Sequence, residues 1–460
     1  MKRLVANLLL CILLSILVTG CATNSLFINY PSQLKQQKQA LNSPQPTAKI
    51  SELVSNINGN DGLLYAQEAG RVAQVSGDFA ASQNYYSKAI TAYQAFDDKA
   101  TISASNVGAN ASSLLLNDNA IPYSGAGYER ILLHQYQALN YLFQDDFQGA
   151  LVEVKQANQL QQREQNRYAE SKKSVQAIAN GTINTETNRL SAATGSVTSS
   201  FLNAYSYYMT GLLHEALNEP NDAFIDYRKA AQIWPGNTYL QQTLVRLAKQ
   251  LSMPQYADLK NRWGEPIQPL LNQGELVVLY ETGFAPEKQD ITVPFRINGN
   301  WQTASMATYS GRSPTWRNAR FNGVGSTPLI TQPITDIDAL AINALKEQLP
   351  ATLARQALRV VAKSHLARKV SDKKKQKNDE IDFGSIAIQL FNIITEQADR
   401  RSWLTLPSQA QIARKFLNEG NYPLRVNNSS THSIEIQAGR KTIVWVINTG
   451  NYTRIYSIMI

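Results

Sequence analysis

Cysteine is nearly absent from this chain of 460 residues, which carries two, Cys11 and Cys21. Cys11 lies in an N-terminal apolar run with the features of a cleaved segment, so one thiol remains after cleavage. A single thiol excludes an internal disulfide and a cysteine-based metal centre. Histidine is also scarce, and its four positions match no metal-binding motif. They are His134, His214, His365 and His432.

Motifs for phosphate binding and nucleophilic catalysis are missing as well. Residues 125–127 and 323–326 are glycine-rich, but neither segment follows a strand and opens a helix, as phosphate sites require. We therefore predict no cofactor and no metal. His134 and His214 fall in segments with a helical pattern, and we expect both to be packing residues.

Paired carboxylates of the kind that hydrolyse glycosides are not evident. Asp145 and Asp146 occupy a predicted turn between helices, where capping favours Asp. Glu68 and Glu129 fall inside predicted helices. Glu281 follows a predicted strand and precedes a Gly/Pro loop, a better place for chemistry, but no second carboxylate pairs with it.

The overall composition is that of a globular protein, with 43% apolar and 17% charged residues. The length suggests two or three domains. The formal net charge is +9, which becomes +7 when Lys2 and Arg3 are removed. This charge favours anionic surfaces such as lipid, lipopolysaccharide or peptidoglycan.

The N-terminus has the layout of a secretory signal. Lys2 and Arg3 precede an apolar run of about 15 residues, shorter than the roughly 20 that span a bilayer. The run ends in Leu17-Val18-Thr19-Gly20-Cys21, which resembles the lipobox of bacterial lipoproteins. The resemblance implies cleavage before Cys21, lipid on Cys21 and, because Ala22 follows, delivery to the outer membrane facing the periplasm. The alternative is an ordinary signal peptide or an uncleaved anchor. Nucleic acid is not an expected partner in that compartment.

The segment from Gly62 to about Trp263 repeats one helical pattern three times. In each copy a turn precedes small, large and small residues on one helix face, and a further small residue lies twelve positions upstream. The residues are Gly70, Ser82, Tyr86 and Ala89; Ala138, Ala150, Val154 and Ala157; Gly211, Ala223, Tyr227 and Ala230. The register resembles the tetratricopeptide repeat, in which such residues let two helices interlock. A generic helical bundle is the alternative.

The chain beyond Pro266 changes to a mixed pattern. Strands are predicted at 275–280, 290–297, 301–308 and 327–335, helices at 337–369 and 381–397, and a final β-meander at 422–427, 432–437, 441–447 and 452–459. We place 441–447 inside the sheet, because it is too apolar for an edge. A basic run near residues 368–377 is interpreted as a solvated loop.

The predicted fold class is α+β and multidomain, with a helical repeat domain followed by an α+β domain. We divide the chain into a signal at 1–20, a lipidated tether with a possible first helical hairpin at 21–60, repeats at 61–265 and the α+β domain at 266–460.

Five strings also resemble a family of poorly characterised Gram-negative outer-membrane lipoproteins with tetratricopeptide-like helical repeats. They lie at 65–71, at 116–118 with 128–130, at 138–142, at 279–286, and at 397–403 with 406–407. The family brings no agreed activity, and the resemblance implies a gene neighbourhood with lipoprotein activators of penicillin-binding proteins.

We predict a non-enzymatic scaffold whose concave helical face binds another envelope protein. Aromatic side chains are enriched at such surfaces, which nominates Tyr85, Tyr136, Tyr207 and Tyr208, although we expect at least half of these to be core. Arg400 and Arg401 are candidates for recognising carboxylates on a partner or on peptidoglycan, against ordinary ion pairing within the domain. The alternative function is a peptidoglycan-binding or peptidoglycan-modifying enzyme with a site near 281–288.

Overall fold

The computed structural model describes residues 29–103, 121–175, 181–297, 300–310, 315–349, 352, 398–427 and 431–460. Predictions for the signal, Cys21, His365, the basic run and the helix at 381–397 lie outside these ranges. Among the helices described, none is both long and apolar enough to cross a bilayer.

The described chain is α+β, as predicted, with helices preceding the main strands. The helices are α3 (Tyr30–Leu41), α4 (Ile50–Val54), α5 (Gly62–Ser76), α6 (Phe79–Ser103), α7 (Gly127–Leu142), α8 (Phe147–Val175), α9 (Gly181–Ala193), α10 (Ala204–Ala216), α11 (Pro220–Ile233), α12 (Thr238–Gln250) and α13 (Tyr256–Trp263). Asparagine side chains cap the N-termini of several of these helices. Asn203 accepts from the backbone N–H groups of Tyr205 and Ser206, and Asn237 from that of Leu240.

Three hairpins, α5–α6, α7–α8 and α10–α11, follow the predicted small-residue register. A Cβ on Gly70 would lie 2.3 Å from the Tyr86 ring, and one on Gly211 would lie 2.8 Å from the Tyr227 ring. The helices of α5–α6 and of α10–α11 can cross this closely because the glycine has no side chain, and the small Ala138 takes that position in α7–α8. The expected interlocking of helices is therefore confirmed.

The strands form three sheets. The main sheet has the order β11-β10-β1-β7-β6, a second sheet has the order β5-β4-β8-β9, and β2 pairs with β3. Strand bounds are β1 (Gln273–Thr282), β2 (Gln289–Ile297), β3 (Asn300–Thr308), β4 (Arg320–Asn322), β5 (Leu329–Ile330), β6 (Gln332–Asp336), β7 (Gln409–Asn418), β8 (Gly420–Val426), β9 (His432–Ile436), β10 (Lys441–Asn448) and β11 (Thr453–Met459).

The prediction of one continuous C-terminal β-meander is wrong. Its first and last hairpins, β8–β9 and β10–β11, are present, but they belong to different sheets. Strand β10 pairs with β1 in parallel instead of with β9. The reason is burial: β10 is apolar on both faces and is enclosed by a neighbour on each side, as predicted for 441–447.

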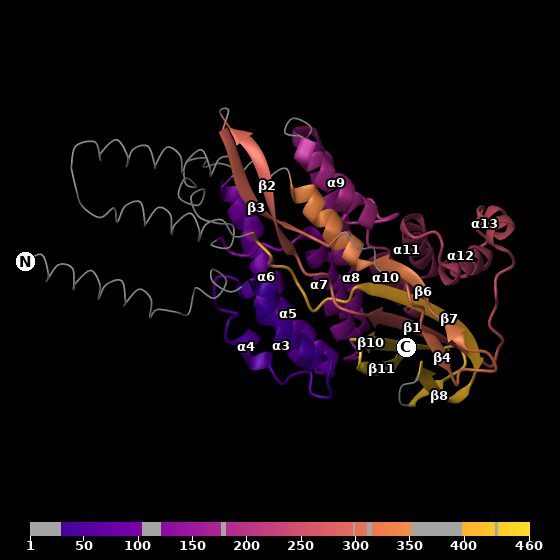
Figure 1. Ribbon diagram of the computed structural model, residues 1–460. Helices are drawn as coiled ribbons and strands as arrows, with labels where there is room; N and C mark the ends of the chain where they lie inside the picture. Colours follow the sequence, from indigo (N-terminus) through magenta and orange to yellow (C-terminus); the bar gives the residue numbers. More distant parts are fainter. Residues whose placement is uncertain are drawn as a thin grey trace, which may run out of the picture.

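The main sheet is the middle of three layers. Val277 and Leu279 of β1 pack into the core shared with the helices, whereas Leu276 and Val278 pack into the core shared with the second sheet. Figure 1 shows β1 and β10 beside α7 and α10, where Tyr136 stacks on Trp445 and Tyr205 donates to Glu281. The chain's own sheet therefore fills the inner face of the helical hairpins, where we expected a partner.

Candidate functional site

A buried ion pair lies at the centre of the helix–sheet interface. The Arg71 guanidinium of α5 is 2.6 Å from the Glu281 carboxylate of β1, and neither side chain is more than 1% exposed. Arg71 also lies over the Tyr136 ring, 4.4 Å from its centroid. Burial raises the pKa of Glu281, and the Arg71 charge opposes that rise. Glu281 therefore has no face open to a glycan, which removes the carboxylate on which the enzyme alternative depended.

Two further helix carboxylates hold a loop from the other half of the chain. Glu68 accepts from the backbone N–H groups of Leu404 and Thr405, at 2.8 and 3.2 Å. Glu129 accepts from the backbone N–H of Trp403 at 3.0 Å. Burial raises the pKa of Glu68 to about 7, and the hydrogen bond from Thr405 opposes that rise. These acids fasten residues 403–405 to the helices, a structural role that their helical positions alone did not reveal.

Arg401 is an internal ion-pairing residue, so its prediction as a binding residue is wrong. It is 3% exposed, and its guanidinium lies 2.5 Å from Asp61 and 2.8 Å from Asp399. Both carboxylates belong to this chain, so the Arg401 guanidinium is already neutralised within the fold. The alternative of ion pairing within the fold is the one observed.

Arg400 is only partly enclosed. Its Nε donates to the Lys288 carbonyl at 2.6 Å, and its Nη1 lies 3.2 Å from the Asp290 carboxylate. The Asp290 side chain is 49% exposed, so this pair contributes little to stability. Arg400 stays a candidate for contacting an anionic group.

A second ionic cluster, of five residues, also joins the helices to the main sheet. Glu215 of α10 lies 2.8 Å from Arg414, 2.5 Å from Arg246 and 2.9 Å from Lys441. Glu275 of β1 shares Arg414 and Lys441 at 2.7 and 2.5 Å. Burial acts to raise the pKa of Glu215, but the charges of Arg414 and Lys441 outweigh it and hold that pKa well below its usual range. Sequence reasoning missed this cluster because its members come from α10, α12, β1, β7 and β10.

Two of the four nominated tyrosines are core residues. Tyr136 and Tyr208 are 0% exposed, so the prediction that they line a binding surface is wrong. Both rings fill space between the helices and the sheet, where the apolar area of an aromatic ring is most stabilising. Tyr85 and Tyr207 are half-buried, with the ammonium groups of Lys88 and Lys229 at 5.8 and 5.3 Å from their ring centroids. These two stay candidates for an outer surface.

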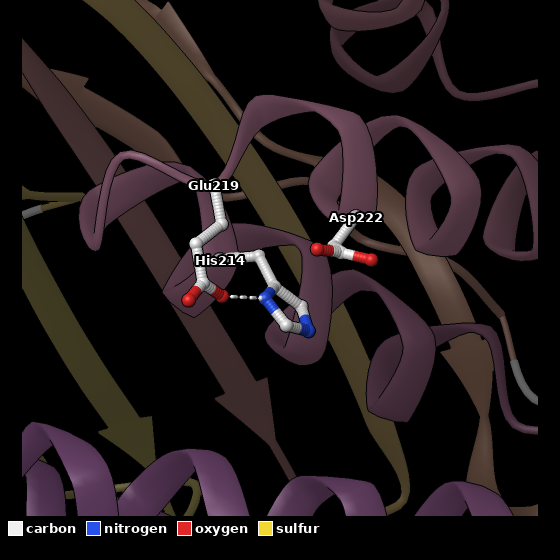
Figure 2. A group of neighbouring side chains, drawn as sticks. All are labelled: His214, Glu219 and Asp222. Carbon is white, nitrogen blue, oxygen red and sulfur yellow. Dashed lines mark hydrogen bonds and ion pairs between the residues drawn. The ribbon is translucent and has the colours of Figure 1, made fainter.

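The turn between α10 and α11 brings together a group that the sequence did not reveal. His214 Nδ1 lies 2.5 Å from a Glu219 carboxylate oxygen. Ligand-type atoms of His214, Glu219 and Asp222 all lie within 4.8 Å of one another, and Figure 2 shows Asp222 beside the other two. The sequence spacing hid this group because the hairpin turn folds α11 back beside α10. By contrast, His134 pairs with Glu153 at 2.6 Å across α7 and α8.

An apolar groove lies at the far end of the helical stack. A cavity of about 540 Å³ is bounded by α11, α12 and α13, with Phe224, Leu259 and Trp263 among its lining residues. Arg228 and Arg262 also line it. No residue of α13 is buried. The linker that follows exposes three large apolar residues, Ile267, Leu270 and Leu271, by 65%, 64% and 102%.

Comparisons with known proteins give little further guidance. No family model matches the chain, and no curated protein does. One solved structure, "Crystal structure of MamA", has a TM-score of 0.29 at 10% identity and covers 52% of this chain and 92% of its own. A second, "Crystal structure of MamA protein", has a TM-score of 0.19 at 14% identity and covers 45% of this chain and 98% of its own. At such TM-scores the likeness carries no argument about fold or function.

Proposed function

We propose that this protein is a non-enzymatic outer-membrane lipoprotein, anchored through Cys21, that acts as a periplasmic scaffold for another envelope protein. The lipobox-like residues before Cys21 support the anchor, and the helical hairpins support a binding role. The inner helical face is not available as the docking surface of this scaffold, because the chain's own sheet occupies it.

The observation that carries the proposal is the open end of the stack. A helical repeat normally ends in a cap with a polar outer face. Here the α11–α13 end instead presents the groove next to Trp263 and an exposed apolar linker. Exposed apolar surface of this kind is typical of protein interaction sites.

The occupant that fits this groove is an amphipathic helix with acidic flanks from a partner protein. A groove between helices accepts the apolar face of another helix. Neither Arg228 nor Arg262 has a carboxylate partner among the residues described, so an acidic flank would complement both charges. In Figure 1, α3 and α13 lie at opposite ends of the molecule. The groove is therefore remote from α3, and a lipid anchor on Cys21 would leave it facing away from the membrane.

A photocrosslinking amino acid tests the proposal in intact cells. We would place it at Arg262 in the groove and, as the control, at the exposed Lys35 of α3. We expect position 262, and not position 35, to crosslink to an acidic helical segment of one envelope protein, identified by mass spectrometry. Arg228→Glu should remove that crosslink. Equal adducts at both positions, no adduct at 262, or an adduct mapped to a segment that is neither acidic nor helical would contradict the proposed docking surface.

A further inference from the structure

The end of α10 and the start of α11 place one imidazole and two carboxylates around a common point. His214 lies in the last turn of α10, Glu219 immediately precedes α11, and Asp222 lies in its first turn. We propose that His214, Glu219 and Asp222 bind one divalent transition-metal ion. The inference is independent of the proposed scaffold function and of where the protein resides.

The hairpin fixes the backbone positions of these three residues before any metal arrives. The turn closes through Asn218, whose φ is 61°, and through the Glu219 N–H, which donates to the His214 carbonyl at 2.8 Å. The close crossing at Gly211 and Tyr227 fixes α10 against α11 one turn away. Because the backbone that carries the ligands is already ordered, binding loses little free energy to ordering it.

The donor set selects the class of ion. One imidazole nitrogen and two carboxylates suit Zn²⁺, Co²⁺ or Ni²⁺, whereas Mg²⁺ and Ca²⁺ prefer oxygen ligands alone. The His214 side chain is 5% exposed, while the Glu219 side chain is 45% exposed. The ion would therefore rest against a fixed buried imidazole, with water in its remaining positions. An ion bound at Nδ1 would replace the contact between His214 and Glu219.

A third carboxylate, that of Asp226, lies behind the ring, which distinguishes this group from a simple acidic cluster. Asp226 approaches the other ring nitrogen, Nε2, to 3.8 Å. A metal-bound histidine usually directs its second nitrogen toward a carboxylate, which orients the ring and raises its basicity. Three carboxylates thus lie near His214, and one of them, Asp226, is ion-paired with Lys229 at 3.3 Å.

The competing interpretation is a helix N-terminus with favourable acidic residues and an imidazole–carboxylate ion pair. The chain supplies a matched control for it. His134 and Glu153 form the same kind of contact at 2.6 Å, and no third metal-ligand residue joins them among the described residues. A metal should therefore distinguish His214 from His134, whereas simple ion pairing would not.

Calorimetric titration of the full chain, purified in detergent and stripped with chelator, tests the site with ZnCl₂ and, for its visible spectrum, CoCl₂. We expect one ion per chain, no detectable binding in His214→Ala or Asp222→Asn, and unchanged binding in His134→Ala. Asp226→Asn should weaken binding by about tenfold, as loss of a supporting carboxylate does.

Circular dichroism of each variant separates loss of the site from loss of the fold. Asp222 is exposed, so Asp222→Asn decides the matter if His214→Ala does not fold. The proposal is overturned if the unaltered chain binds neither ion at millimolar concentration. It is equally overturned if His214→Ala and Asp222→Asn bind as the unaltered chain does, or if His134→Ala loses binding too.

Discussion

Arg71 and Glu281 are 210 positions apart in the chain, yet they form a 2.6 Å ion pair that joins the first repeat hairpin to the first strand of the main sheet. Both are almost completely excluded from solvent. Their pairing makes the helical and strand halves of the chain depend on one another, since either charge alone would be buried without compensation.

Arg71→Met should destabilise the protein strongly. It leaves the Glu281 carboxylate buried and unpaired, which costs about 3–5 kcal/mol in comparable sites. Urea denaturation measures the loss. The double variant Arg71→Met/Glu281→Leu removes both charges and should recover much of the stability. A single-variant loss below about 1 kcal/mol would show that the pair does not hold the two halves together.

Gly70→Ala tests the interlocking of the first repeat hairpin. The added methyl group would lie 2.3 Å from the Tyr86 ring, so the helices must separate. Overpacking of this kind costs about 1–3 kcal/mol. Gly236→Ala is the matched control, because no atom lies within 4 Å of a Cβ added there. Thermal unfolding should separate the two variants, and equal melting temperatures would mean that Gly70 is not a packing requirement.

Glu68 should make stability depend on pH. Its pKa in the folded chain is about 7, above the value of 4.5 for the free side chain. The folded state therefore binds the proton more tightly than the unfolded state does. The Glu68 contribution is fully present below about pH 4.5 and is lost as the pH rises through about 7, by no more than about 3 kcal/mol.

Urea denaturation of the unaltered chain and of Glu68→Gln, at several values between pH 5 and pH 8, checks this sign. The unfolding free energy of the unaltered chain should fall relative to that of Glu68→Gln as the pH rises, because Gln does not titrate. Parallel pH profiles for the two proteins would contradict the raised pKa.

The parts of the fold that sequence reasoning predicted depend on contacts between nearby residues. Gly70 and Tyr86 are 16 positions apart, and the turn between them brings the two helices together, so a repeated small–large register is visible in the sequence. The hairpins β8–β9 and β10–β11 are local for the same reason.

The parts that were missed depend on distant partners. Parallel pairing of β1 with β10 joins Val277 to Ile443, and β7, an interior strand of the main sheet, was not predicted at all. The sequence signal for the buried ionic interface was the presence of two charged residues, Glu68 and Arg71, in an otherwise apolar helical segment. Charged side chains are rarely buried unless they are paired, and α5 is buried along nearly its whole length. Their partners in the strand half could not be identified, because the backbone N–H groups that Glu68 binds, those of Leu404 and Thr405, lie more than 300 positions away.

Cys21→Ala tests the membrane anchor on which the proposed location depends. Cys21 is one of two cysteines in the chain, and the other, Cys11, lies within the apolar run that precedes the predicted cleavage point. We expect cells fed a labelled fatty acid to label the unaltered chain and not the variant, which should appear as soluble or unprocessed protein on fractionation. Cys11→Ala is the matched control and should leave labelling unchanged, because Cys11 does not follow the small residues of a cleavage site. Label retained in Cys21→Ala, or lost equally in Cys11→Ala, would refute the assignment. The groove at α13 would then have no predicted orientation relative to a membrane.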